Sequence, residues 1–181
     1  MKKVIFTLIL IQLLNFAGTA QKIFHTRINK TDVSLRGSTV VLGEVTVSSA
    51  TAGKVVLRFD GDCISTAGDM IMLAASNTQQ WGNNDNSVNV RAISADLNSN
   101  VFSHTRVYDV PAGVHSFYAV AENYSDMAGT GRASIYGSLT AEWFPEISGQ
   151  AFVRHKGISQ SNFNVEGAPV ILAEQSINTP V

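Results

Sequence analysis

Apolar residues recur at every second position in several short segments, and this alternation limits what the chain can fold into. In residues 132–144, Ile135, Leu139 and Trp143 share one parity, while Tyr136 falls on the other. Such a period places the apolar side chains on one face of a β-strand. The same pattern predicts strands in 39–47, 54–60, 88–95, 101–110 and 114–124, with one or two more between 22 and 35.

Turn-forming residues separate these segments, and no amphipathic helix is predicted between them. Pro111 to Gly113 lies between two predicted strands, which we interpret as a hairpin. Residues 69–76 are apolar on both parities, which is typical of a strand covered on both faces. Many short strands with such turns predict an all-β fold, a two-sheet, jelly-roll-like sandwich of about 8–10 antiparallel strands.

The start of the chain has the pattern of a secretory signal peptide. Lys2 and Lys3 precede an apolar run, and Gly18 and Ala20 supply small side chains before a cut at Gln21. The run of about 11 residues is too short for a permanent transmembrane helix, since the hydrocarbon core is about 30 Å thick. We therefore expect a secreted or extracytoplasmic protein, in the periplasm or outside the cell.

The rest of the chain is long enough for one substantial core. We expect a cleaved signal-peptide helix at residues 1–20 and a β-sandwich domain at 21–148. Residues 149–181 alternate more weakly, which predicts a partly ordered C-terminal extension.

Charge and cysteine content restrict the expected partners. Without Lys2 and Lys3 the chain keeps 11 of its 13 basic residues against 14 acidic ones, a formal charge of −3. No nucleic-acid partner is expected, because one would need a basic surface. No later apolar run predicts a membrane span. The single Cys63 can form no internal disulfide, and we expect it to be a buried, small apolar residue.

The loop at residues 79–87 is a candidate ligand-binding site. It carries Trp81 beside Asn83, Asn84 and Asp85. An aromatic face can stack on a sugar ring, and amide or carboxylate groups can bind its hydroxyls, so this loop predicts carbohydrate binding. The alternative is a long turn whose Trp81 packs against the edge of the core.

Three aspartates suggest calcium, the one cofactor that the sequence allows us to name. Asp60, Asp62 and Asp69 bracket a glycine-containing segment, 61–68, that we interpret as a loop, and calcium prefers oxygen ligands. The spacing does not match the helix–loop–helix calcium motif. Aspartate beside glycine is also ordinary turn chemistry, so a metal-free turn is the alternative.

The histidines do not predict a zinc site. If residues 101–110 and 114–124 form a hairpin, His115 lies opposite Asp109, about 17 Å along the strand from His104. The two histidines then cannot share a metal ion, and His115 forms a surface cross-strand pair with Asp109.

Two glutamates are candidate acid and base groups for glycoside cleavage. Glu122 and Glu142 lie on long strands that we expect to be neighbours, and both alternate with core positions. The alternative is that both are solvated strand residues.

Two segments, 110–123 and 134–145, resemble jelly rolls of the tumour-necrosis-factor and complement-head type. The matching residues are Val110, Pro111, Gly113, His115 and Phe117 in the first segment, and Gly137 and Leu139 in the second. The chain departs from that pattern by continuing well beyond Pro145. The resemblance implies a trimeric head that presents a binding surface, with Tyr118, Tyr136 and Phe144 buried between subunits. The short basic leader and Asn-rich loops also resemble those of exported bacterial proteins.

These observations favour a secreted, non-enzymatic binding or assembly module that forms a homo-oligomer, with a trimer favoured. A glycan or a cell-surface molecule is the expected external partner. The alternatives are a carbohydrate-binding domain that uses the Trp81 loop and a glycan-active hydrolase.

Overall fold

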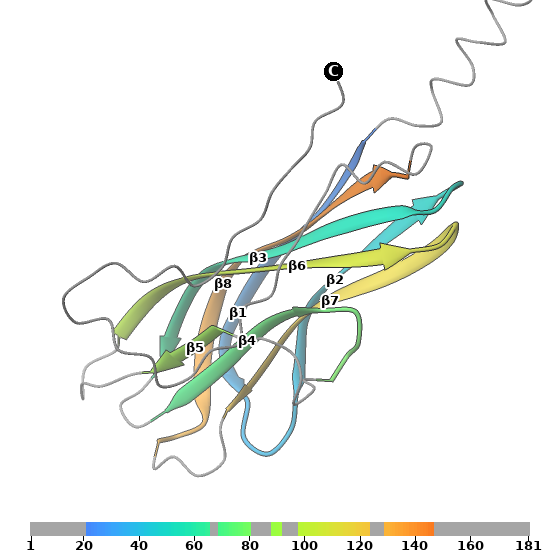
Figure 1. Cartoon of the computed structure of the whole chain (residues 1–181). Helices are drawn as coiled ribbons and strands as arrows, with labels where there is room; N and C mark the ends of the chain where they lie inside the picture. Colours follow the sequence, from blue (N-terminus) through green and yellow to red (C-terminus); the bar gives the residue numbers. More distant parts are fainter. Residues whose placement is uncertain (1–20, 66–68, 81–87, 92–97, 124–128, 147–181) are drawn as a thin grey trace, which may run out of the picture.

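The computed structural model describes residues 21–65, 69–80, 88–91, 98–123 and 129–146, apart from the side chains of 88–91 and 98. These residues form eight β-strands and contain no helix (Figure 1). The strands are β1 (Lys22–Ser34), β2 (Val40–Ser49), β3 (Gly53–Ser65), β4 (Met70–Ser76), β5 (Val88–Arg91), β6 (Asn98–Val110), β7 (Gly113–Asn123) and β8 (Arg132–Pro145). Within these ranges no helix could span a membrane. The predicted signal peptide and C-terminal extension lie outside the described residues.

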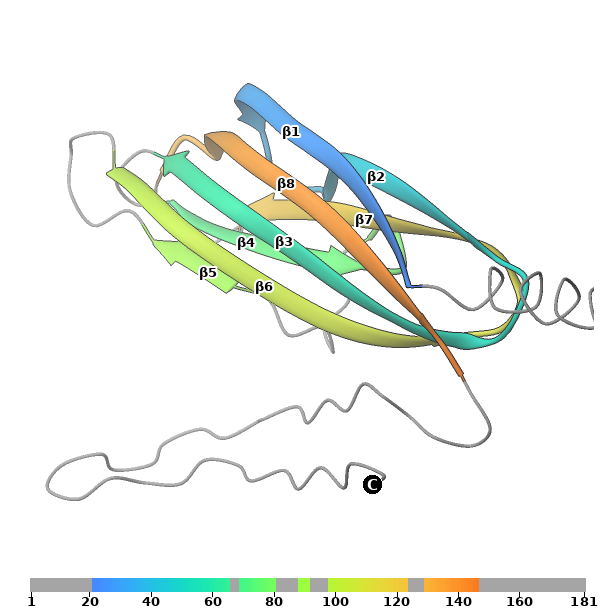
Figure 2. The ribbon, with the colours of Figure 1, turned by 90° about the horizontal axis from the view of Figure 1, so that it is seen from above.

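The strands form two antiparallel sheets with jelly-roll connectivity. Sheet A has the order β1-β8-β3-β6, and sheet B has the order β2-β7-β4-β5. Seen from above, β1, β8, β3 and β6 lie side by side across the strands of sheet B (Figure 2). This is the two-sheet, eight-stranded arrangement that a jelly roll requires, so the predicted fold class is confirmed.

The core lies between the sheets and follows the predicted alternation. The largest fully buried side chains include Phe59 from β3, Phe117 from β7 and Trp143 from β8. In β2 the alternation shifts, because a β-bulge between Val41 and Gly43 changes the register. Val41 therefore lies on the outer face, although it shares the parity of the buried Val45.

Strand β4 is buried on both faces, as its composition predicts. Ile71 and Leu73 face the other sheet and are fully buried. On the opposite face, Met72 is 5% exposed and Ala74 is 0% exposed.

The predicted hairpin at residues 111–113 is wrong. Strand β6 pairs with β3 in sheet A, whereas β7 pairs with β2 and β4 in sheet B. The Pro-Ala-Gly turn therefore carries the chain from one sheet to the other. Asp109 lies opposite Lys54 and forms an ion pair with it, while His115 lies opposite Val47.

The loop expected from residue 61 is also wrong, because β3 continues to Ser65. Gly61 lies directly opposite Gly137 of β8. A Cβ atom on either glycine would collide with a backbone carbonyl of the adjacent strand. Gly61 therefore allows a close approach of two strands and does not form a turn.

Candidate functional site

A groove crosses the outer face of sheet A and encloses about 830 Å³. All four strands of the sheet line it, through residues 27–29 of β1, 136–137 of β8, 60–62 of β3 and 101–103 of β6. These segments are brought together by register, since Asn29 lies opposite Tyr136 and Asp62 lies opposite both Tyr136 and Val101.

Two adjacent glycines lie beneath the groove. Gly61 and Gly137 alternate with the outward-facing Asp60, Asp62 and Tyr136, and the buried Ile28 and Phe102 flank them on the core side. The floor of the groove is therefore the backbone of the sheet. Val101, which is 88% exposed, and Tyr136, which is 36% exposed, add apolar surface at the outer face.

Serine hydroxyls hold the two carboxylates of the groove in place. Ser103 Oγ donates a hydrogen bond of 2.5 Å to Asp60, and Ser99 Oγ lies 2.8 and 2.7 Å from the two oxygens of Asp62. Each carboxylate has about four lone-pair sites, so both keep acceptor capacity for a ligand.

Donors and an aromatic ring complete the groove. Arg27 and Asn29 are exposed, and neither has a hydrogen-bond or ion-pair partner among the described residues. The hydroxyl of Tyr136 lies 3.4 Å from Thr31 Oγ1, which tethers the edge of the ring. A second hollow, of about 460 Å³, also includes Tyr136 in its lining. The ring therefore borders two adjoining depressions.

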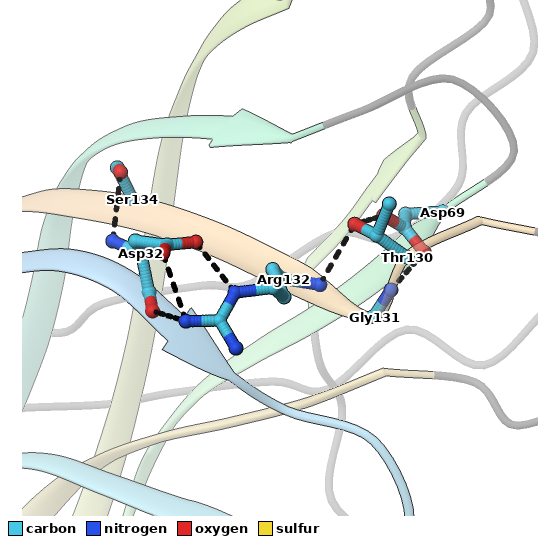
Figure 3. Close-up of polar contacts among 6 residues, drawn as sticks. All are labelled: Asp32, Asp69, Thr130, Gly131, Arg132 and Ser134. Atoms are coloured by element: carbon cyan, nitrogen blue, oxygen red, sulfur yellow. Dashed lines mark hydrogen bonds and ion pairs between the residues drawn. The ribbon is translucent and has the colours of Figure 1, made fainter.

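The structure does not bring the three candidate calcium ligands together. Asp60 and Asp62 lie in the groove, whereas Asp69 is fully buried beside the start of β8 (Figure 3). Asp69 accepts hydrogen bonds from the Gly131 amide (2.8 Å), the Asn123 side chain (2.9 Å) and Thr130 Oγ1 (3.3 Å). In the part of the chain that the structure describes, no three His, Cys, Asp or Glu side chains form a group that could hold a metal.

An ion pair fixes β1 against β8 beside this network. Arg132 Nε and Nη2 donate to the carboxylate of Asp32 at 2.6 and 2.8 Å, and Ser134 Oγ accepts from the Asp32 amide (Figure 3). The hydrogen bonds from Arg132 hold the pKa of Asp32 below its ordinary value. Asp32 has a φ of 53° at the irregularity between Lys30 and Val33, a conformation that aspartate tolerates better than most residues. We interpret this cluster as structural.

The other predicted site residues fall in different places. Trp81, Asn83, Asn84 and Asp85 lie outside the described residues. Glu122 and Glu142 lie in different sheets, so the prediction that their strands are neighbours is wrong. They accept hydrogen bonds from Thr39 Oγ1 (2.6 Å) and Gln21 Nε2 (3.3 Å), respectively.

The histidines also lie apart in the fold. His104 is buried between the sheets, and its Nδ1 accepts a hydrogen bond of 2.9 Å from the Ala75 amide. His115 is on the opposite sheet, with its Nε2 2.9 Å from the Pro111 carbonyl. The expected cross-strand pair of His115 with Asp109 is therefore wrong.

Comparison with known proteins identifies similar solved structures only. No protein-family model and no curated protein matches the chain. The VP2 subviral particle of infectious bursal disease virus is 11% identical, with a TM-score of 0.45, over 70% of this chain and 34% of VP2. The chain thus spans about a third of that protein. The globular domain of zebrafish complement 1qA protein is 13% identical, with a TM-score of 0.40, over 69% of this chain and 97% of that domain.

Proposed function

We propose that this protein is a non-enzymatic binding module that holds its ligand across the outer face of sheet A. The observation that carries the proposal is the groove, because it combines the exposed apolar surface of Val101 and Tyr136 with polar groups that keep unused hydrogen-bonding capacity. Binding sites typically have this composition, with a few placed polar groups on an apolar surface.

The polar groups are positioned before a ligand arrives. The Ser103–Asp60 and Ser99–Asp62 hydrogen bonds fix two acceptors on one regular strand. Groups that are already ordered lose less conformational entropy when a ligand binds.

A fragment screen tests this function without knowledge of the ligand. Small polar and aromatic fragments would be added to the isotope-labelled chain, and backbone amide shifts would be recorded by NMR. We expect the shifts to concentrate at residues 27–29, 60–62, 101–103 and 136–137. The function is rejected if fragments bind only elsewhere, or if none binds.

We further propose that the protein is exported and that its chains assemble, with a trimer favoured. Export is supported by the leader at residues 1–20, and assembly by a row of outward-facing residues on sheet A, away from the groove, in which three of the four side chains are apolar. The row runs from Ile23, which is 65% exposed, to the half-buried Val56 and Val107, with Glu142 between them. Light scattering tests assembly by measuring the mass of the oligomer, and intact mass measurement tests export by showing whether the leader has been removed.

A further inference from the structure

We propose that the ligand of the sheet A groove is a neutral oligosaccharide. This inference rests on the proposed function, because it names the chemical class that the same groove would bind. Three properties of the groove support it: its aromatic wall, its mixed charge and its length.

The aromatic wall is Tyr136. Tyr136 is 36% exposed, its hydroxyl lies 3.4 Å from Thr31 Oγ1, and the residue lines the groove. The C–H face of a pyranose packs well on such a ring, since an aromatic side chain offers a large apolar surface with a polar edge. Val101 extends the apolar surface on the neighbouring part of the wall.

The charges of the groove favour a neutral ligand. Among the residues that line the groove, Asp60 and Asp62 carry negative charges and Arg27 carries a positive one. Arg58 lies beside the groove, with its Nε 3.9 Å from Asp60. A ligand with a charge of either sign would therefore meet a like charge in or beside the groove. Hydroxyl groups both donate and accept, so a row of them can bind the carboxylates, the guanidinium of Arg27 and the amide of Asn29 together.

The length of the groove favours a chain of sugars over a single one. The groove crosses four strands, and three inter-strand spacings of about 4.8 Å give about 14 Å. A monosaccharide would reach only part of this row. Affinity should therefore increase with the number of sugar units until the groove is filled.

The experiment is a panel of neutral and acidic oligosaccharides, from disaccharides to hexasaccharides, followed by calorimetry on the best ligands with the purified chain. We expect neutral oligosaccharides to bind and Tyr136→Ala to weaken binding about tenfold or more, whereas Tyr136→Phe keeps the stacking surface and most of the affinity. Tyr118→Ala, on the outer face of sheet B, is the matched control and should bind like the unchanged chain.

Arg27→Ala separates binding from folding, because Arg27 is exposed and has no partner among the described residues. It should weaken binding without changing the melting temperature. The inference is overturned if only acidic glycans bind, or if Tyr136→Ala and Arg27→Ala bind normally while Trp81→Ala does not. If fragments contact the groove but no neutral glycan binds, the ligand class alone is wrong; if neither binds, the proposed function fails as well.

Discussion

Cys63 lies in the core, where its thiol is protected. It is 0% exposed, on the inner face of β3. Burial, with a smaller contribution from the charge of Asp62, raises the pKa of the Cys63 thiol from 9.0 to about 12. The thiolate is the reactive form of cysteine, so a thiol that is both buried and protonated should be inert. The sequence-based expectation of a buried, small apolar residue is thus met.

This environment predicts a specific loss of stability at alkaline pH. Between pH 9 and pH 12 the folded state keeps the Cys63 proton and the unfolded state releases it, so the free energy of unfolding falls as pH rises. The slope is about 1.4 kcal/mol per pH unit at most, and the full stability is present below pH 9. Urea unfolding of the unchanged chain and of Cys63→Ala at several pH values measures the difference. Parallel pH curves for the two chains would show that the thiol is not the cause.

At the scale of the strands, the close approach of β3 and β8 should be sensitive to one added carbon. In Gly61→Ala the new Cβ meets the backbone carbonyl of Tyr136, which cannot move without disturbing the sheet. We expect a loss of about 1–3 kcal/mol, the usual range for overpacking, together with a changed groove floor.

Gly43→Ala is the matched control for this change. Its Cβ would lie 3.1–3.4 Å from side-chain carbons of Ile28 and Thr26 and would not collide with a backbone carbonyl, so its cost should be smaller. Urea unfolding compares the two variants. An equal loss in both would mean that the backbone contact between β3 and β8 is not what makes Gly61 necessary.

The strands themselves could be predicted because each depends on local alternation. The predicted segment 132–144 becomes β8 with its expected inner face, and 69–76 becomes a strand buried on both faces. The connections between strands were harder to predict, because a turn sequence such as Pro111 to Gly113 suits either a hairpin or a crossing from one sheet to the other. Gly61 was misinterpreted for a related reason, since glycine allows both turns and close strand contacts.

The groove could not be predicted from the sequence. It depends on the registers of β1, β8, β3 and β6, which are pairings between segments far apart in the chain. Alternation indicated that Asp60 and Tyr136 face away from the core, whereas Asp62 was expected in a loop, and nothing in the sequence indicated that the three lie beside one another. Local sequence shows only residue type and spacing, and these pointed to Trp81 and to a calcium site.

For the molecule as a whole, jelly-roll connectivity determines which residues meet. Strands from the beginning, middle and end of the described region are adjacent in sheet A, so one surface combines Arg27, Asp60, Val101 and Tyr136. The three residues expected in a trimer contact are separated by the same connectivity. Tyr118 lies on the outer face of sheet B, while Tyr136 and Phe144 lie on sheet A, eight positions apart on β8. They cannot form one continuous patch on a single subunit.

The row of Ile23, Glu142, Val56 and Val107 lies on one face of a single subunit, so a contact there can be tested by single substitutions. Light scattering should show an oligomer, with a trimer favoured, and intact mass should show a chain that begins at Gln21. Ile23→Lys should shift the protein toward the monomer, because it replaces an exposed apolar side chain of the contact with a charged one. The new lysine lies opposite Glu142, which has the opposite charge, so the substitution should not destabilise the strand pair by repulsion.

Val114→Lys is the matched control, since Val114 is 68% exposed on the outer face of sheet B. It should leave the mass of the assembly unchanged. A strict monomer at high concentration would contradict assembly. If Val114→Lys dissociates the oligomer while Ile23→Lys leaves its mass unchanged, the contact lies on sheet B. The row and the groove lie about four to six residues apart along β1, roughly 13–20 Å, so the two sites use different residues of the same sheet face.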